Sequence, residues 1–356
     1  MTGFIVPGNL KYAPYVRYYM DEFKKNNADF EIISWDKNGL SEDEVDHVFH
    51  YKVSDMQRKK VLWGYLGFSR FAKKICRKKK YDNLVVFTIA PAVFMSTFLL
   101  RKYNKNYILD IRDDSPFVRK TPKIFMKVRD GAKDLVSSSR FFFKWIGKEC
   151  YMCHNCDAQA ISDHRDDELN NSVSHPIRIV FAGIMNEARI NVWMLRQIKS
   201  YDDFDFYFWG PKSEGMEDVS RLGNEMGIKN LHFGGRYNKQ DIVKIYRENA
   251  DFVNIIRKKS EVNRNALPNK LYDAAIAGKP VIVFDHNEAV CEYVEKYGLG
   301  IILSEEDSGD FENVLKRKIS EFSMEHYEKG RIAFIDELMK DREEFNLMVK
   351  RFLANN

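Results

Sequence analysis

Short apolar runs alternate along the chain with longer stretches in which hydrophobic residues recur every three or four positions. Short runs rich in β-branched and aromatic residues are typical of buried strands, and the longer spacing is typical of amphipathic helices. This alternation predicts α/β units built around parallel sheets. The expected strands begin at Gly3, Phe30, Asn83, Asn106 and Ala158, and then, in a second series, at Ile177, Phe204, Asn230, Asp251 and Lys279.

A polar stretch, DHRDDELNNSVSHP, separates the two series of strands and ends at Pro176. It has few apolar side chains that could dock it against a core, as is typical of a linker. The chain has 356 residues, the length of about two domains. We therefore expect one α/β domain over residues 1–172, a second over residues 173–335, and a C-terminal helix over residues 336–356 that packs back on the first domain.

The sequence beyond Asp310 has a helical pattern to its end. Its apolar residues recur near helical spacing, so they need a groove in which to pack. These residues are Phe334, Leu338, Phe345, Met348 and Phe352.

The charge balance argues against a dedicated nucleic-acid binder. The chain has 57 lysines and arginines against 52 acidic residues, a net charge of only +5, and we find no recognition motif. No apolar run is long enough to span a membrane, and the N-terminus lacks the basic and then apolar layout of a signal peptide. We therefore expect a cytoplasmic protein.

Three of the five cysteines are clustered in CYMCHNC, at Cys150, Cys153 and Cys156, around His154. An odd number of cysteines is no disulfide framework, so free thiols are expected. The C-x-x-C spacings resemble part of a zinc or iron–sulfur ligand set, but a fourth ligand is missing nearby. The favoured interpretation is that these residues continue a helix, FFFKWIGKECYMCHNCDA, in which the cysteines act as small buried hydrophobes.

The segment NRNALPNKLYDAAIAGKPVIVF, residues 263–284, predicts a loop, a helix and a strand. The helix is expected to begin near Asn269 and to break at Gly278. A helix N-terminus presents unpaired N–H groups and a positive dipole end to an anion. Lys270, in the first turn, would add a full charge toward a diphosphate, and Asp273 could accept hydrogen bonds from a ribose. The alternative is an ordinary loop, helix and strand with two surface charges.

PNKLYDAAIAGKPVIV resembles the donor-binding segment of GT-B glycosyltransferases, especially family 4, in which a P-x-K-x-x-E helix followed by A-x-G-x-P-V-I holds a nucleotide sugar. The resemblance covers most of the second domain, with a looser match over the first. It implies two Rossmann-like α/β domains that face a central cleft. The other pieces that match the family's successive strand ends are FAG at Phe181, FWGP at Phe208, LHFGGRY at Leu231 and ADFVNII at Ala250.

The resemblance implies that a sugar moves from a nucleoside diphosphate to an acceptor hydroxyl with retention at the anomeric carbon. Charge builds up on the departing diphosphate, and cationic side chains and helix N-termini stabilise it, so neither a metal nor a cofactor is required in this architecture. Lys270 is the first candidate for such a catalytic cation. Arg189 is the second, although the family's R-x-x-x-x-K-G spacing is not reproduced in GIMNEARIN, and a plain surface arginine is the alternative.

The family also carries an E-x7-E pattern, whose second acid contacts the ribose and whose first lies near the transferred sugar. Asp273 falls at the second position, but eight residues earlier the chain has Asn265, and Glu261 is the substitute we consider. The remaining donor-binding candidates are Gly210 in FWGP, Tyr237 just beyond LHFGG, and Asn269 at the start of the helix. Tyr237 could equally be an aromatic residue that starts the next helix.

The first domain supplies three further candidates. Gly8 and Asn9, after the first strand, could let the backbone approach the donor phosphate or the acceptor, because glycine lacks a Cβ; a simple turn is the alternative. Asp113 lies in LDIRDDSPF, and related enzymes have a similar D-x-R-D stretch. It could orient or deprotonate the acceptor hydroxyl, unless Arg112, Asp113 and Asp114 form only an ion-pair turn.

Two basic regions suggest binding to an anionic membrane surface. RFAKKICRKKK, residues 70–80, has seven basic residues and no acid, and residues 116–148 mix basic residues with aromatic ones. Such mixtures suit an anionic bilayer and would fit a lipid-linked or saccharide acceptor. The aromatic residues are Phe117, Phe125, Phe141, Phe142, Phe143 and Trp145. The alternative is that they face the core while the lysines solvate a helix.

The leading hypothesis is a metal-independent retaining glycosyltransferase of hexosyltransferase type, on the inner face of the cell membrane, that builds a surface polysaccharide or glycolipid. One alternative is a nucleotide-sugar epimerase of the same architecture, which would need acids in the cleft. A catalytically degenerate scaffold or binding subunit is another. A dehydrogenase is disfavoured because no G-x-G-x-x-G follows the first strand, and a serine hydrolase because G-x-S-x-G does not occur.

Overall fold

The computed structural model describes residues 1–40, 42–53, 58–156, 158–167, 169, 173–185 and 188–354. The chain divides into two units, which we call the first unit (Met1–Asn155 with Lys340–Asn356) and the second unit (Cys156–Met339). Part of the expected linker, Glu168 and residues 170–172, lies outside the described residues.

In the first unit, seven parallel strands form one sheet among the described residues, in the order β3-β2-β1-β4-β5-β6-β7. The order turns back between β1 and β4, so the chain leaves these two strands in opposite directions along the sheet. The strands are β1 (Thr2–Val6), β2 (Phe30–Asp36), β3 (His47–His50), β4 (Asn83–Phe87), β5 (Tyr107–Ile111), β6 (Asp134–Ser137) and β7 (Tyr151–Met152).

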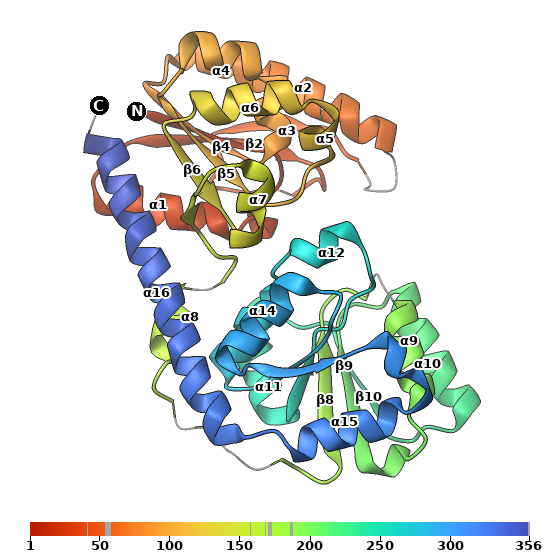
Figure 1. Cartoon of the computed structure of the whole chain (residues 1–356). Coiled ribbons are helices and arrows are strands. Elements are labelled where there is room, and N and C mark those ends of the chain that lie inside the picture. Colours follow the sequence, from red (N-terminus) through yellow and green to blue (C-terminus); the bar gives the residue numbers. More distant parts are fainter. Residues whose placement is uncertain are drawn as a thin grey trace. The chain divides into compact units, whose positions relative to one another are not determined.

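Helices cover both faces of this sheet (Figure 1). One face packs against α2 (Arg58–Lys79), α3 (Ile89–Phe94), α4 (Ser96–Lys102) and α6 (Pro122–Gly131), with α5 (Pro116–Lys120) beside them. The other face carries α1 (Tyr15–Lys25), and the Tyr19 ring on α1 lies edge-on to that of Phe345, 4.8 Å between centroids. The short segments are η1 (Leu10–Tyr12), η2 (Arg140–Phe142) and α7 (Phe143–Ile146).

The second unit contains a parallel sheet of six described strands, in the order β10-β9-β8-β11-β12-β13. Its strand order turns back between β8 and β11, and in open α/β sheets such a point is where ligands bind. The strands are β8 (Ile177–Ala182), β9 (Phe204–Trp209), β10 (Leu231–Gly235), β11 (Phe252–Asn254), β12 (Val281–Phe284) and β13 (Gly300–Leu303).

The apolar core of the second unit joins one face of this sheet to α9 (Ala188–Gln197), α10 (Glu214–Met226) and α15 (Phe311–Ser320). The remaining helices are α8 (Ala158–Asp163), α11 (Ile242–Asn249), α12 (Glu261–Asn265), α13 (Asn269–Ala277) and α14 (Glu288–Tyr297). Short 3₁₀ segments are η3 (Tyr201–Asp203), η4 (Lys239–Asp241) and η5 (Glu305–Gly309).

The expected C-terminal helix is present as α16, which begins at Met324 and runs to Ala354. Residues up to Met339 belong to the second unit, where Phe334 stacks on Tyr272 of α13, and residues from Lys340 belong to the first unit. The five apolar residues that we expected to pack in a groove are all buried. They are Phe334, Leu338, Phe345, Met348 and Phe352.

Two local predictions in the middle of the chain are wrong. Residues 158–163 were expected to form a strand and form helix α8 instead, because a run this short has too few positions for its periodicity to distinguish a strand from a helix. The long helix expected through the cysteine cluster stops at Gly147, which adopts a left-handed conformation with φ of 72°. The chain then enters the short strand β7, which pairs with β6.

Candidate functional site

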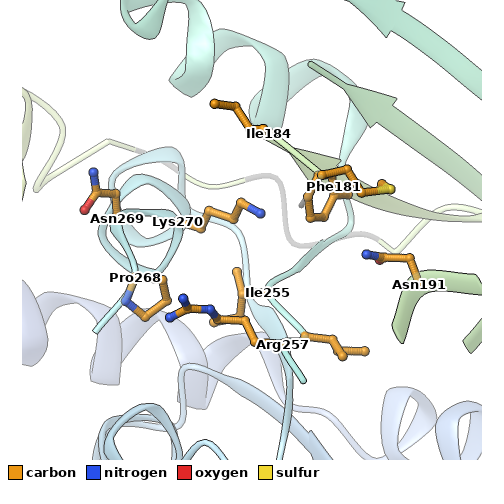
Figure 2. A pocket seen from close by; sticks show the side chains of 10 residues that line it. Phe181, Ile184, Asn191, Ile255, Arg257, Pro268, Asn269 and Lys270 are labelled. Carbon is orange, nitrogen blue, oxygen red and sulfur yellow. The ribbon is translucent and has the colours of Figure 1, made fainter. Parts of the chain in front are cut away.

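A hollow of about 300 Å³ opens at the carboxyl ends of β8 and β11, where the strand order of the second unit turns back. Figure 2 shows its lining side chains, which come from three places: the end of β8 with its following loop and helix, the end of β11, and the start of α13. The lining residues are Phe181, Ile184, Met185, Asn191, Ile255, Ile256, Arg257, Pro268, Asn269 and Lys270. The described lining therefore has two cationic side chains and no carboxylate.

Lys270 reaches into this hollow from the first turn of α13 (Figure 2). Pro268 precedes that turn as the N-cap and supplies no side-chain hydrogen bond, so the positive end of the helix is left for a ligand. The Lys270 Nζ lies 3.5 Å from the centroid of the Phe181 ring. Gly183, with φ of 138°, makes room for this side chain, because a Cβ there would approach Lys270 Cε to 3.2 Å. Asn269 lines the same hollow, as the sequence predicted for the helix start.

Arg257 is a second cation in the lining, and the sequence reasoning missed it. It lies three residues after the end of β11, and its carbonyl accepts a hydrogen bond from Nε2 of His286 at 2.7 Å. Asn254 lies three residues earlier, at the end of β11. Its side-chain NH₂ donates to Asn191 Oδ1 at 2.9 Å, and its Oδ1 accepts from the Ile256 N–H at 2.9 Å. These bonds fix the loop that carries Arg257. The signal for it was its place in the sequence, a charged residue immediately after the apolar run DFVNII.

Asp273 lies on α13 one turn after Lys270 and is only 6% exposed. Lys239, from η4, forms an ion pair with it. Burial, and then the charge of Asp273, raise the pKa of Tyr237 to about 12, so the Tyr237 phenol keeps its proton at neutral pH. The charge of Asp273 acts on the Tyr237 phenol, so the two residues stay candidates for one ribose and base site.

Gly210 lies where two loops approach each other rather than in the lining of the hollow. A Cβ at this position would come within 2.2 Å of the Gly183 carbonyl oxygen. The Gly210 N–H donates to the Gly235 carbonyl at 2.8 Å, and the Gly183 N–H donates to the Trp209 carbonyl at 2.8 Å. Gly210 thus holds together the chain segments that follow β8, β9 and β10.

We expect Gly210→Ala to weaken nucleotide binding by about 10-fold and to lower the free energy of unfolding by about 1–3 kcal/mol, because the added methyl group must push the Gly183 loop aside. Urea unfolding and calorimetric titration with a nucleoside diphosphate measure both effects. Gly309→Ala is the matched control, since a Cβ there meets nothing within 4 Å. Equal effects of the two substitutions would contradict this role of Gly210.

The other candidates of the second unit are not among the described residues that line the hollow. Arg189 is exposed on α9, and its neighbours Asn186 and Glu187 in the GIMNEARIN stretch lie outside the described residues. Asn265 ends α12 and is half-buried. Glu261 is exposed at the start of α12 and lines a different hollow of about 590 Å³, together with Arg264.

In the first unit, the candidates follow the carboxyl ends of β1 and β5. Asn9 is buried, and its amide donates to Asp36 Oδ1 at 3.1 Å and to Glu42 Oε2 at 3.2 Å, so the side chain holds its own loop. Gly8 has open space where a Cβ would be. Asp113 is exposed directly after Arg112, whose side chain is buried against Asp110.

The thiols of Cys150 and Cys153 are not activated. Burial raises the pKa of Cys150 to about 12 and also raises that of Cys153. Across the described ranges, no group of three or more His, Cys, Asp and Glu side chains is placed to hold a metal ion. Among the same residues, none of the helices has the length and apolar character needed to cross a bilayer.

Residues 176–321 match the family model described as Glycosyl transferases group 1, a range that contains the hollow and α13. Over these residues the chain is similar to group 1 glycosyltransferases. No curated protein sequence matches the chain.

Solved structures are similar in fold over the whole chain. Sucrose-phosphate synthase from Thermosynechococcus elongatus has a TM-score of 0.68 at 11% identity, with all of both chains covered. A glycosyltransferase from Rickettsia africae has a TM-score of 0.64 at 13% identity, over 100% of this chain and 99% of its own. WaaG, a glycosyltransferase involved in lipopolysaccharide biosynthesis, has a TM-score of 0.62 at 12% identity, over 98% and 99%. The fold is therefore GT-B, and the expected resemblance to that class is confirmed.

Proposed function

We propose that this protein is a retaining glycosyltransferase that moves a sugar, a hexose, from a nucleoside-diphosphate sugar to an acceptor hydroxyl. One observation carries the proposal. Lys270, Arg257 and the N-terminus of α13 converge on one hollow at the turning point of the sheet, inside the range that matches group 1 glycosyltransferases.

This arrangement suits the departure of a nucleoside diphosphate. As the bond to the sugar breaks, negative charge grows on the oxygens of the leaving diphosphate. Two cationic side chains and a helix N-terminus, held in place before the reaction, stabilise that charge without reorganisation. Lys270 is the catalytic cation in this proposal, and Arg257 joins it. In this scheme these groups, rather than a divalent metal, stabilise the leaving group.

Asp273 is proposed to bind the ribose of the donor. An ionised carboxylate accepts hydrogen bonds from the two ribose hydroxyls, and its place on α13 puts it one helical turn from the diphosphate site. Tyr237 lies beside it and is proposed to contact the base. Lys239 forms an ion pair with Asp273. When the donor binds, the Lys239 side chain would either move away from Asp273 or lie beside the ribose.

We expect Asp273→Asn to raise the dissociation constant of a nucleoside diphosphate by about 10-fold, because a hydrogen bond to a charged group is lost. The dissociation constant of inorganic pyrophosphate, which has no ribose, should stay the same or fall. Calorimetric titration of both ligands measures this difference. Lys239→Gln is the control, since it removes the ion pair and keeps the carboxylate. A uniform loss for both ligands would contradict a ribose contact.

The acceptor is assigned to the first unit in this proposal. Asp113 is exposed at the carboxyl end of β5 and can accept a hydrogen bond from an acceptor hydroxyl. A lipid-linked saccharide of surface polysaccharide synthesis is the acceptor class that we propose. An assay with lipid-linked and with free saccharides distinguishes the two classes of acceptor.

The first test is the thermal stability of the protein with UDP-, GDP-, CDP- and TDP-sugars, with and without Mg²⁺. A ligand at 100 times its dissociation constant should stabilise the folded state by about 2.7 kcal/mol. Stabilisation by one nucleotide class, independent of Mg²⁺, is the expected result. If no nucleotide sugar stabilises the protein, the donor site is wrong and a binding subunit becomes the better interpretation.

An epimerase of the same fold is the less favoured function. Elimination and re-addition of the nucleotide need an acid and a base close to the sugar, whereas the described lining of the hollow contains no carboxylate. Conversion of a nucleotide sugar to its epimer in the absence of any acceptor would favour the epimerase.

A further inference from the structure

We propose that the layer formed by α2, α3, α4, α5 and α6, which we call the basic layer, binds directly to the surface of an anionic bilayer. This inference goes beyond the proposed transfer reaction and does not depend on it, because it rests on the charge and exposure of the first unit alone. Figure 1 shows these helices together on one face of the sheet of the first unit.

The charge of the basic layer is the first argument. Sixteen of the chain's 57 lysines and arginines lie in these five helices, against a single acidic residue, Asp130, within the same ranges. The rest of the chain therefore has more acidic than basic residues. The charge is concentrated on one side of one sheet, although the chain as a whole carries only +5.

The cations of α2 also stand close to one another. Burial, and then the charges of Arg77 and Arg70, lower the pKa of Lys73. Four exposed residues of α2 make no ion pair with any described residue: Arg70, Lys74, Arg77 and Lys78. Like charges without acidic partners destabilise the isolated protein slightly, and an anionic surface removes that repulsion.

Exposed apolar side chains are the second argument. Trp63 and Leu62, on α2, are 63% and 44% exposed, and Met126 and Ile124, on α6, are 44% and 39% exposed. Each pair is flanked by basic residues, Lys60 on α2 and Lys123 with Lys127 on α6. Apolar side chains between lysines are typical of a helix that lies in the headgroup region, with the apolar groups inserted and the charges at the phosphates.

Ring contacts connect these two groups of exposed residues. Tyr65, on α2, stacks on Phe94 at the end of α3, with 6.3 Å between centroids, and Phe94 contacts Phe117 of α5 at 5.2 Å. α5 in turn packs against α6. The first half of α2 and the first half of α6 therefore belong to one packed layer of helices.

This surface differs from the one that the sequence suggested. None of the six aromatic residues named for residues 116–148 is exposed, and Phe125 and Phe142 are fully buried in the core. These six side chains are therefore not the exposed apolar groups of this layer. The side chains that could insert are Trp63, Leu62, Ile124 and Met126 instead.

An anionic bilayer explains this surface better than a nucleic acid does. Nucleic-acid binding needs cations and a groove or stacking platform, but it gives no reason for an exposed aliphatic residue on each of two helices. A bilayer uses both the charge and the apolar side chains. We therefore assign the layer to lipid.

The test is sedimentation of the purified full chain with vesicles, one set of phosphatidylcholine and one of phosphatidylcholine with phosphatidylglycerol. We expect binding only to the anionic vesicles, and we expect it to weaken as salt is raised, because the screening length shrinks from about 10 Å at 0.1 M to about 3 Å at 1 M. Equal binding to both vesicle types would overturn the proposal.

Two pairs of variants separate the charge from the apolar contribution. Replacing Arg70, Lys74, Arg77 and Lys78 together with glutamine should lower the partition coefficient on the order of 1,000-fold, given about 1 kcal/mol for each basic residue. The control replaces four exposed cations of the second unit with glutamine, namely Arg196, Lys199, Lys212 and Lys229, and should bind as the wild type does. Equal losses in both quadruple variants would mean that net charge, rather than this layer, drives binding.

The second pair compares Leu62→Ser with Leu347→Ser, two exposed leucines on α2 and α16. Only Leu62→Ser should weaken vesicle binding, by about 3- to 10-fold for a partly inserted side chain. The thermal shift with nucleotide sugars should be unchanged in all four variants, so failure of this proposal and failure of the transferase proposal are distinguishable. Tighter binding to a DNA duplex than to vesicles, with no effect of Leu62→Ser, would make this face a nucleic-acid surface and overturn the proposal.

Discussion

Replacing Lys270 with methionine should lower the turnover number of sugar transfer by about 100- to 1,000-fold, the usual effect of removing one group that stabilises developing negative charge. The methionine keeps most of the length and the apolar stem of lysine, so the substitution removes the charge and little else. The Lys270 ammonium lies over the ring of Phe181, near the carboxyl end of β8. Helix α13 begins one residue before Lys270. No other side chain in the described lining combines a positive charge with a helix N-terminus.

The measurement is steady-state kinetics with the donor that stabilises the protein, together with the thermal shift that this donor produces. Lys270→Met should lose most of the shift, while the melting temperature without ligand should change by no more than a few degrees, since a cation–π contact such as that with Phe181 contributes only about 0.5–2 kcal/mol. Lys270→Arg should recover part of the rate because it restores the charge. Lys212→Met, at an exposed position of the same unit, is the control. A wild-type rate in Lys270→Met would refute the assignment.

The predictions for the second unit rested on strong local patterns. Each of its first five strands was expected within a residue or two of where it lies, because β-branched and aromatic runs such as those of β8 and β9 are bounded by Gly, Pro and charged residues. The start of α13 at Asn269 followed from Pro268 before it and Gly278 after it. Lys270 and Asn269 line the hollow for the same local reason.

Short strands at the margins of the sheets could not be read from the sequence. β7 has two residues and β3 four, too few for a periodic pattern, and each exists because a neighbouring strand pairs with it. The sequence around residues 151–152 predicts a helix. These residues form a strand instead, because they pair with β6. Propensity is a weak guide where the neighbouring strand supplies the hydrogen bonds.

The candidate site shows a similar division between local and tertiary information. Asp273 was found because it lies one helical turn from Lys270, whereas Arg257 enters the hollow from a different strand 13 residues earlier in the chain. The motif FWGP at a strand end predicts that Gly210 binds the sugar donor. In the structure, Gly210 packs against the Gly183 carbonyl and so sets the geometry of the loops. This contact could not be predicted from the local sequence. Contacts between strand ends depend on the order of the strands.

Replacing Asp110 with alanine should lower the free energy of unfolding of the first unit by about 3–5 kcal/mol, because it leaves the buried charge of Arg112 without a carboxylate. Asp110 is 0% and Arg112 4% exposed. Asp110 Oδ2 accepts from Arg112 Nη2 at 2.5 Å and from the Tyr19 hydroxyl at 2.8 Å. The guanidinium also lies 4.0 Å from the centroid of the Tyr15 ring.

This ion pair does more than support the core. Arg112 Nη1 donates to the Cys153 carbonyl at 2.6 Å and the Arg112 carbonyl accepts from the Ser138 hydroxyl at 2.9 Å, so the pair ties β5 to the segments that follow β6 and β7. The next residue along the chain is Asp113, the proposed acceptor-binding carboxylate. Loss of the pair should therefore release the loop that presents Asp113 before the unit unfolds as a whole.

Native-state hydrogen exchange at the amides of β5 and β6, combined with urea unfolding, measures the loss in the first unit separately from the second. The double substitution Asp110→Ala with Arg112→Met should cost less than Asp110→Ala alone, because it removes the uncompensated charge. Glu44→Ala is the control: it breaks an exposed pair with Arg17 and should cost less than about 1 kcal/mol. A double variant that is less stable than Asp110→Ala would mean that the destabilisation comes from lost packing, and that the buried charge of Arg112 is compensated without its carboxylate.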